Sequence, residues 1–566
     1  MHTEKILTGY PSIDKPWLKY YGEETTHKID LCDTIYNNFL KIANKKPDSL
    51  AFIDFKTGLK TTYSQLLQQA DDFANSLAAM GIGNCNKIGV LGFNSLVDPV
   101  AVLGSNKIGS TVIFVDPNGG VPEIAKNVDS LDILVLENIF AEMESAINQR
   151  EIPVIVYGEN SVSFRPNCID YKCFIDKGSN YNISPSEYEG ERPSLVVFSS
   201  GSTGAPKPIV HSDYTVNAAV QKMLYSDFPL TEDNFLIKAI PSHIGLGVIT
   251  TMLTALLAGI PYIQLKGFPD PVLDLLGETN DLISNYKQWL AENGFDTNSN
   301  LLLFAAPIFA KFMMKEIDRF DDLSFLSGIL LGGSKMTKEE LDLMDTVFSA
   351  KGLKTPVCNG YGQNEMAGAV SLNTVSHNKN GSAGYPVYNT NIRIVDRYTL
   401  DDVPFNTVGQ ILEQSDSRFL YYLGMPEKTE KAKITLSDGS EWYDSTDLGY
   451  MDEDGFLFIT GRTTRVVIKA DHKVSMDVIE EKIRKIDFVR EVAIVPSVVE
   501  GDVIAFLCLN KAISADKIMD LLNTEQVGLS IFEVPARVKI VDELPRMNNG
   551  KVDYMKLEKI AKKIES

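Results

Sequence analysis

The chain has 566 residues, 44% of them apolar and 23% charged, and its 54 Lys and Arg against 75 Asp and Glu give a net charge of −21. This length exceeds the roughly 250–300 residues at which a single core stops growing, so we expect more than one domain. The composition excludes disorder, a collagen-like repeat and a disulfide-built miniprotein. The acidic balance argues against a general nucleic-acid binder, because an acidic surface repels phosphate, but it leaves room for a local cationic pocket.

Cysteine usage and hydropathy both indicate a cytoplasmic protein. Only Cys168 and Cys173 of the six cysteines are close together, and no nearby histidine completes a zinc site. Sparse cysteines indicate a reducing compartment, and the N-terminal residues lack the apolar core of a signal peptide. The apolar stretch 244–265 is interrupted by Gly259 and Pro261. We therefore predict a buried helix followed by a short strand there, and no transmembrane segment.

The first third of the chain alternates short apolar strands with amphipathic helices. Helices are expected at 63–80 and near 99–108, and strands are expected at 51–55, 87–92, 111–115, 133–136, 154–157 and 195–198. Alternation of this kind indicates a parallel, doubly wound sheet. The pattern continues to about Met344, so we expect an α/β fold for this part of the chain.

The pattern of expected secondary structure changes after about residue 389. Short strands separated by Asp/Gly turns up to about residue 458 predict a small antiparallel β subdomain. From about residue 466, helices and strands are expected in the same segment. The helices are expected at 476–486 and 515–522, and the strands at 491–496, 503–509 and 536–541. We therefore predict a large N-terminal domain, residues 1–463, and a small α+β C-terminal domain, residues 464–566.

A Gly/Ser-rich loop follows the expected strand at 195–198. Residues 199–207 read Ser-Ser-Gly-Ser-Thr-Gly-Ala-Pro-Lys. Small residues let backbone N–H groups approach a polyphosphate, hydroxyls add donors, and Lys207 adds a point charge. A flexible surface loop is the alternative for such a string. The P-loop of nucleoside triphosphatases is excluded, because Pro206, Lys207 and Pro208 stand where its Gly-Lys-Ser/Thr would be needed.

Several motifs, taken in order, resemble those of the adenylate-forming enzymes: acyl- and aryl-CoA synthetases, peptide-synthetase adenylation domains and beetle luciferases. Residues 200–207 resemble the phosphate-loop signature, with Pro208 where glycine is usual. The other similar segments are 241–245 (Pro-x-x-His-x-x-Gly, with the glycines displaced), 332–334 (the adenine-lining segment), 359–365 (Tyr-Gly-x-Thr-Glu, with Asn364 for threonine), 442–449 (Trp-x-x-Thr-Gly-Asp, with Ser445 for threonine and Thr446 where glycine is common), 461–469 (the hinge) and 549–553 (the C-terminal lysine motif). Together they span nearly the whole chain.

The resemblance implies that the protein converts a carboxylic acid and ATP to an acyl-adenylate and pyrophosphate, with Mg²⁺. Lys207, Thr203, Glu365, His243 and Lys551 would be catalytic, and Glu365 and Thr203 would hold Mg²⁺. The β- and γ-phosphates would lie on the loop that contains Ser199, Ser200, Gly201, Ser202 and Gly204. The alternatives are a solvated loop carboxylate for Glu365, a solubilising lysine for Lys551 and a hydrogen-bonded core histidine for His243.

The resemblance also implies a nucleoside site. Asp447 would accept hydrogen bonds from the ribose hydroxyls, with Arg462 nearby. Asn359 would form hydrogen bonds with the adenine edge, and Tyr361 would stack on the adenine ring. The remaining residues implied at this site are Gly332, Gly333, Ser334, Gly360, Gly362 and Ile459. A core tyrosine and a simple Asp–Arg surface pair are the alternatives.

The second half-reaction of such enzymes passes the acyl group to a thiol after the small domain rotates about a hinge, here at Thr464. The acceptor would be CoA or the phosphopantetheine of a carrier protein, and the latter would act in trans because no carrier domain follows Ser566. His472 stands where the family has a glycine that lets pantetheine pass, and an imidazole there would narrow the path of free CoA.

The start of the expected pocket helix, 243–249, carries no carboxylate to pair an α-ammonium group. A simple aliphatic or aromatic acid is therefore the expected substrate. Three alternatives stay open: an acyl-AMP ligase that does not use CoA, an oxidative relative of the luciferase kind, and a catalytically inactive binding homologue. Lys207, Glu365, Asp447 and Lys551 argue against the last.

Overall fold

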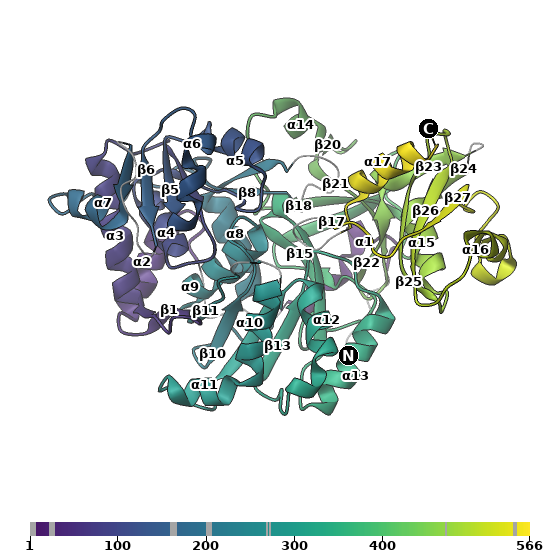
Figure 1. Ribbon diagram of the computed structural model, residues 1–566, viewed down its shortest axis with the longest axis horizontal. Coiled ribbons are helices and arrows are strands. Elements are labelled where there is room, and N and C mark those ends of the chain that lie inside the picture. The colour runs from purple at the N-terminus through teal and green to yellow at the C-terminus, as the bar shows by residue number, and fades with distance from the viewer. Residues whose placement is uncertain are drawn as a thin grey trace.

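The structure is a computed structural model, and it describes residues 7–21, 29–158, 167–199, 206–267, 270, 273–469, 472–546 and 552–565. Two large sheets flanked by helices form the bulk of the protein, and the C-terminal strands form a smaller lobe beside them (Figure 1). The predicted α/β architecture is confirmed. Among the helices of the described residues, none is long and apolar enough to cross a membrane.

The first sheet is mostly parallel and runs in the order β19-β9-β8-β4-β3-β5-β6-β7 among the described residues. Its strands are β3 (Lys87–Leu91), β4 (Thr111–Phe114), β5 (Ile133–Glu137), β6 (Val154–Tyr157), β7 (Cys168–Asp170), β8 (Pro193–Phe198), β9 (Pro208–Ser212) and β19 (Tyr421–Tyr422). Strand β9 pairs antiparallel with both β8 and β19. This edge of the sheet therefore joins the two ends of the Gly/Ser-rich loop to a strand that lies far away in the sequence.

The second sheet runs in the order β16-β15-β14-β13-β12-β10-β11-β1-β2 among the described residues. Its strands are β1 (Leu50–Asp54), β2 (Lys60–Thr62), β10 (Asn234–Lys238), β11 (Tyr262–Gln264), β12 (Asn300–Ala305), β13 (Leu326–Leu331), β14 (Val357–Gln363), β15 (Gly368–Leu372) and β16 (Tyr385–Pro386). The pairs from β14 through to β1 are parallel. Their carboxyl ends meet at one edge, where ligand sites of α/β sheets normally lie.

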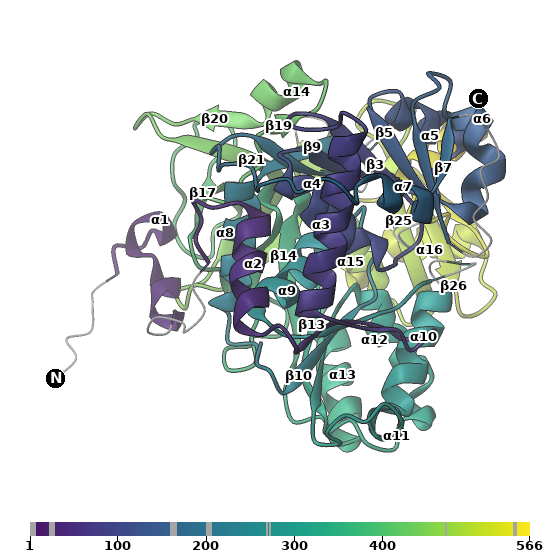
Figure 2. The same cartoon turned by 90° about the vertical axis from the view of Figure 1, so that its left-hand side faces the viewer.

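Helices between the two sheets bury one shared core, which takes side chains from both sheets. They are α2 (Ile35–Lys45), α3 (Tyr63–Ala79), α4 (Val97–Lys107), α8 (Asp213–Leu224), η3 (Leu246–Leu253) and α9 (Thr254–Ala258). Figure 2 shows α2 and α3 lying side by side. Helix α3 begins at a capping box made by Thr62 and Gln65, and its residues Leu66, Ala70 and Phe73 are buried because they recur at helical spacing.

Further helices cover the outer faces of the two sheets, on separate cores. They are α5 (Val121–Val128) and α6 (Glu144–Ile147) on the first sheet, and α10 (Leu273–Ser284), α11 (Tyr286–Glu292), α12 (Pro307–Lys315) and α13 (Lys338–Ala350) on the second; α7 (Tyr171–Lys177) packs on α3. The helix predicted within 244–265 is confirmed. Its first part, η3, is a π-helix, it ends at Gly259 with a φ of 76°, and β11 follows it.

The predicted small antiparallel sheet is confirmed as β17 (Thr390–Val395), β18 (Gly409–Ser415), β20 (Lys433–Thr435), β21 (Glu441–Met451) and β22 (Leu457–Arg462), with α14 (Pro426–Lys431) beside it. The C-terminal lobe contains β23 (Val466–Lys469), β24 (His472–Ser475), α15 (Met476–Arg484), β25 (Val489–Pro496), β26 (Val503–Leu509), α16 (Ala515–Leu522), β27 (Arg537–Ile540) and α17 (Tyr554–Glu565). This lobe buries its own apolar clusters. The boundary at residue 463 stays a prediction.

Candidate active site

The two ends of the Gly/Ser-rich loop are held together by the β8–β9 hairpin. The backbone N–H of Ser199 donates to the carbonyl of Lys207 at 3.0 Å, and the backbone N–H of Lys207 donates to Oγ of Ser199 at 2.9 Å. Ser200, Gly201, Ser202, Thr203 and Gly204 lie outside the described residues. The structure therefore describes the stem of the predicted phosphate loop and Lys207 at its end.

Lys207 belongs to a three-residue cluster with Glu365 and Tyr422. Its Nζ lies 3.1 Å from Oε1 of Glu365 and 2.9 Å from the Tyr422 hydroxyl, which donates to the same Oε1 at 2.8 Å. Glu365 is 6% exposed. Burial raises the pKa of Tyr422, and so does the neighbouring Glu365, so this phenol stays protonated and remains a donor. The sequence motifs predicted Lys207 and Glu365 but not Tyr422, which β19 brings in.

Asn364, which replaces the family's threonine, ties the loop stem to the turn that carries His243. Its Nδ2 donates to the carbonyl of Phe198 at 2.6 Å, and its Oδ1 accepts from the backbone N–H of Gly245 at 3.2 Å. The carbonyl of Asn364 lies 2.8 Å from Nε2 of His211, a buried residue. Burial lowers the pKa of His211 to about 4, so the ring is neutral at neutral pH and serves as a fixed support.

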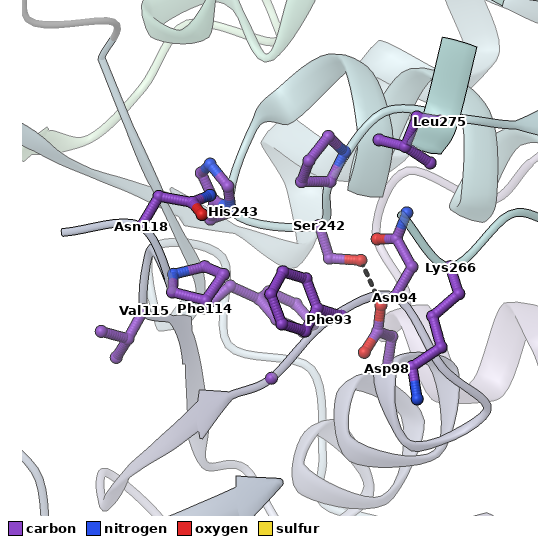
Figure 3. Close-up of a pocket in the computed structure, with 13 residues that line it drawn as sticks. Phe93, Asn94, Asp98, Phe114, Val115, Asn118, Ser242, His243, Lys266 and Leu275 are labelled. Carbon is purple, nitrogen blue, oxygen red and sulfur yellow. Dashed lines mark hydrogen bonds between the residues drawn. The ribbon is translucent and has the colours of Figure 1, made fainter. Parts of the chain in front are cut away.

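His243 lies beside a small cavity between the carboxyl ends of strands from both sheets (Figure 3). Its Nε2 is 3.7 Å from Oδ1 of Asp116, and burial lowers its pKa although Asp116 opposes this, so the ring is neutral. The neighbouring Ser242 donates to Asp98 at 2.5 Å. The cavity is also lined by aromatic and amide side chains, among them Phe93, Asn94, Phe114 and Asn118.

A buried ion pair lies under this turn. Nζ of Lys238 is 3.6 Å from Oδ2 of Asp98 and donates to Oδ1 of Asn94 at 2.8 Å. Burial lowers the pKa of Lys238 to about 8, and it raises the pKa of Asp98 against the opposing charge of Lys238. Two buried charges of this kind are costly unless both partners stay in place. The pair therefore fixes Ser242, and with it the backbone next to His243.

The predicted adenine-lining residues follow β13. The backbone N–H of Gly332 donates to the carbonyl of Ala305, and Gly333 has a φ of 92°. A Cβ on Gly333 would meet nothing within 4 Å, and Ser334 is exposed, so this segment borders open space. In contrast, a Cβ on Gly360 or on Gly362 would lie 2.3 Å or 2.2 Å from atoms of β15. Those two glycines are required by strand packing.

Asn359 is 9% exposed, and its amide is used inside the protein. Its Nδ2 donates to the carbonyl of Ser382 at 2.8 Å, and its Oδ1 accepts from Nδ2 of Asn373 at 2.9 Å. To read an adenine edge as predicted, this amide has to use its second hydrogen or lone pair, or exchange a partner. Nothing in the sequence announced these internal contacts.

Tyr361, Asp447 and Arg462 form a continuous chain, as their predicted shared role requires. The Tyr361 hydroxyl lies 2.6 Å from Oδ2 of Asp447, and Nε of Arg462 lies 2.9 Å from Oδ1 of the same carboxylate. Burial raises the pKa of Asp447, and Arg462 opposes this rise. The antiparallel pairing of β21 with β22 places Asp447 opposite Arg462. The structure brings these residues together although they come from three strands.

Three further side chains, Glu413, Gln363 and Tyr443, extend this row of hydrogen-bonded side chains, and none of them was predicted. Oε1 of Glu413 lies 2.8 Å from the Tyr361 hydroxyl and accepts from Nε2 of Gln363 at 2.9 Å, while the Tyr443 hydroxyl donates to Oε1 of Gln363 at 3.2 Å. Glu413 is fully buried. The sequence signal for Glu413 was its position two residues after Ile411, which places both side chains on the same face of β18. Ile411 is also buried.

Two predicted site residues and the family's glycine position remain to be placed. Ile459 is half-buried on β22, opposite Gly449 of β21. Lys551 lies outside the described residues. His472 is the first residue of β24, and it pairs with Lys469, the last residue of β23. The family's glycine position therefore falls where the two paired strands are connected.

Comparison with known proteins agrees with this geometry. The AMP-binding enzyme family matches residues 39–423, which carry the loop stem, Glu365 and Tyr361. The chain belongs to the AMP-binding enzyme family. The 3-hydroxybenzoate–CoA ligase of Aromatoleum sp. (strain CIB) is 24% identical over 511 residues, which cover 88% of this chain and 92% of that protein. The luciferin 4-monooxygenase of Photinus pyralis is 24% identical over 539 residues, 91% of each chain.

Solved structures of similar fold cover almost the whole chain. ATP-bound MatB from Rhodopseudomonas palustris superposes with a TM-score of 0.77 at 21% identity, over 94% of this chain and 100% of that one. The anthranilate CoA ligase AuaEII, in complex with anthranoyl-AMP, gives a TM-score of 0.78 at 18% identity, over 95% and 98% of the two chains. The predicted AMP-binding family is thus confirmed, and with it the prediction of an acid–thiol ligase that works through an acyl-adenylate.

Proposed function

We propose that this AMP-binding enzyme activates a small carboxylic acid with ATP and Mg²⁺, releases pyrophosphate, and passes the acyl group from the adenylate to the thiol of CoA. The meeting of Lys207, Glu365 and Tyr422 at the stem of the Gly/Ser-rich loop carries the proposal. Substituted benzoates are the first acids to test, because relatives of this chain are named as 3-hydroxybenzoate–CoA and 4-chlorobenzoate–CoA ligases.

The first half-reaction joins two anions, so positioning and charge neutralisation should dominate its barrier. A carboxylate oxygen of the acid forms a bond to the α-phosphorus of ATP, and the bond from that phosphorus to the bridging oxygen of pyrophosphate breaks. Lys207 supplies a cation to the departing phosphates. Lys551, from the C-terminal lysine motif, supplies a second cation to the acid carboxylate and the bridging oxygen.

Glu365 has the donor chemistry that Mg²⁺ requires. The metal is normally held by one or two carboxylates together with substrate phosphates and water, and Glu365 offers a buried carboxylate beside the loop stem. Within the described residues it is not joined by two further Asp, Glu, His or Cys side chains, so the remaining ligands would be Thr203, water and phosphate. Bound Mg²⁺ would neutralise charge on the departing pyrophosphate.

The nucleoside half of ATP belongs beside Tyr361 and Asp447. Arg462 and the Tyr361 hydroxyl each use one oxygen of Asp447. A carboxylate has about four lone-pair directions, so Asp447 can still accept from both ribose hydroxyls. The open segment at Gly332 and Gly333 leaves room for the adenine ring next to Tyr361.

The acid carboxylate is expected next to His243, which is neutral and so presents a hydrogen-bonding imidazole rather than a charge. For the second half-reaction, the small domain (residues 464–566) is proposed to rotate about residue 464. One feature favours a second candidate: His472 at the family's glycine position would narrow a pantetheine path. Transfer to a carrier protein in trans, without free CoA, is therefore the alternative.

Incubation of the purified chain with ATP, Mg²⁺, CoA and single acids from a benzoate and aliphatic panel tests the proposal, with products separated by mass spectrometry. Equimolar AMP and acyl-CoA are expected with at least one acid. Acyl-adenylate without acyl-CoA would favour the carrier alternative. If ATP and acid remained unconverted throughout, the proposal would be wrong.

A further inference from the structure

Glu413 is a carboxyl group buried in the wall of the proposed nucleoside site. It is 0% exposed, and its Oε1 lies 2.8 Å from the Tyr361 hydroxyl and 2.9 Å from Nε2 of Gln363. Its Oε2 is buried as well and has no hydrogen-bond partner among the described residues. A buried ionised carboxylate with one unpaired oxygen is expensive, so this arrangement needs another explanation.

Counting hydrogens around the Tyr361 oxygen supplies one. That oxygen lies within hydrogen-bond distance of Asp447 at 2.6 Å, Glu413 at 2.8 Å and Nε2 of Gln363 at 2.8 Å. Gln363 is oriented by Tyr443, which donates to its Oε1, so its Nε2 is the donor toward Tyr361. The phenol has one hydrogen and cannot donate fully to two carboxylates. Either Glu413 or Asp447 must therefore carry a proton.

The surroundings decide which of the two it is. Asp447 is paired with the guanidinium of Arg462 at 2.9 Å, and it makes the shorter contact with Tyr361, so it is the better anion. The ionisable groups that face Glu413 are Tyr361 on β14, Asp447 and Tyr443 on β21, and Lys222 on α8. Burial, and then Asp447, raise the pKa of Glu413 to about 8, although Tyr361, Gln363 and Lys222 oppose the rise.

We propose that Glu413 is a positioning residue of the nucleotide site: it keeps its proton at neutral pH and donates it to the Tyr361 oxygen, so that the phenol donates to Asp447. The proposal rests on the proposed assignment of Tyr361 and Asp447 to the bound nucleoside. It orders the contacts of the Tyr361 oxygen, which then accepts from Glu413 and Gln363 and donates to Asp447. Glu413 fixes the plane of the Tyr361 ring, and Arg462 with Tyr361 fixes the Asp447 carboxylate as an anion that faces the ribose.

Ionisation of Glu413 would undo this order. A second carboxylate charge would then compete for the single Tyr361 hydrogen and add negative charge beside Asp447, where an anionic nucleotide binds. Glu413→Gln keeps the shape and a neutral N–H donor toward Tyr361 but cannot ionise. Burial lowers the pKa of Lys222 to about 7 and Glu413 opposes this shift, so the two groups are coupled and a second measurement has to report on the Glu413 proton itself.

The test measures equilibrium binding of ATP by calorimetry, without any acid, from about pH 6.5 to about pH 9.5. We expect the wild-type dissociation constant to rise about fivefold across pH 8, the size expected from one added charge in a partly screened site. Glu413→Gln should match the wild type at the lower pH and lack this rise across pH 8. Glu430→Gln, an exposed carboxylate on α14, is the matched control and should follow the wild type. Superimposable profiles for Glu413→Gln and the wild type would overturn the proposal.

An infrared difference spectrum between the wild type and Glu413→Gln in D₂O at about pH 6.5 gives an independent readout, because Glu413 has a pKa of about 8. The carbonyl band of one protonated carboxylic acid should be present in the wild type and missing in the variant, whereas loss of a carboxylate band instead would overturn the proposal. Absence of ATP binding by the wild type would reject the proposed function, and the infrared measurement would still decide whether Glu413 carries its proton.

Discussion

Nζ of Lys207 lies 3.1 Å from Oε1 of Glu365, although 158 residues separate the two in the sequence. The first residue was predicted to hold the terminal phosphates of ATP and the second to hold Mg²⁺. Their contact means that each lies within reach of the other's ligand. A triphosphate carrying Mg²⁺ can replace this ion pair with two charge-matched contacts, and Tyr422 holds the carboxylate in position throughout.

Substitution of Lys207 should therefore affect the terminal phosphates of ATP, and substitution of Glu365 should affect Mg²⁺. Lys207→Met should lower the rate of ATP–pyrophosphate exchange by about 10²-fold, because a cation on the departing phosphates is lost. Glu365→Gln should raise the Mg²⁺ concentration for half-maximal exchange by about tenfold, since a neutral amide is a weaker ligand. Lys338→Met, at an exposed lysine on α13, is the control. A Lys207→Met enzyme as fast as the wild type would contradict the assigned role.

The buried ion pair of Asp98 and Lys238, which lies under the His243 turn, is expected to affect the free energy of unfolding. Asp98→Asn should lower the free energy of unfolding by about 3 kcal/mol, because it leaves the Lys238 ammonium buried without its counter-charge. Adding Lys238→Met should recover most of the loss. Asp342→Asn, which breaks an exposed pair with Lys338, should change stability by less than about 1 kcal/mol. Urea titrations of the four proteins measure this, and a double variant no more stable than Asp98→Asn would contradict the coupling.

His211 predicts the direction of an acid effect. Its pKa falls from 6.5 to about 4 on folding because of burial, so the folded chain binds fewer protons than the unfolded chain between these values. Stability should therefore fall by up to about 3 kcal/mol as the pH drops from 6.5 to 4. His211→Gln should flatten this part of the unfolding profile. An equally steep profile in His211→Gln would show that other groups cause it.

His472 tests the choice of acceptor. If the imidazole at the family's glycine position narrows the path of pantetheine, His472→Gly should raise the rate of acyl transfer to CoA by roughly tenfold while leaving the adenylation rate unchanged. Single-turnover transfer from preformed adenylate measures the step directly. Lys473→Gly, at the next position of β24, controls for a general loosening of the hairpin. Transfer that stayed the same or slowed in His472→Gly would count against a narrowed path.

The fold was predictable from the sequence because its strands and helices differ in hydrophobic period. Strands such as β5 are buried on both faces, and helices such as α3 show clear i, i+4 spacing. The π-helical winding of η3 was not predictable, because a segment that is apolar all round gives no register signal. Lys222 and Lys238 were not expected to be buried, since lysine is rarely found in a core.

The candidate site was predictable only where a motif carries it. Lys207, Glu365, Tyr361 and Asp447 came from motifs, and the structure brings Lys207 to Glu365 and Tyr361 to Asp447. Tyr422 and Glu413 belong to no motif, and they reach the site through strand pairing. Tyr422 contacts Lys207 from 215 residues away, and Glu413 contacts Tyr361 across 52 residues. Contacts of this range depend on the tertiary fold, and one sequence does not specify them.

ATP–pyrophosphate exchange across a panel of aromatic and aliphatic carboxylic acids tests the central claim most directly. The account predicts exchange that depends on at least one acid and that falls by about 10²-fold or more in Lys551→Ala, because a cation on the reacting carboxylate and phosphate is lost. Lys559→Ala, another lysine near the chain end, should exchange like the wild type. A folded, ATP-binding protein that shows no exchange with any acid would contradict the account.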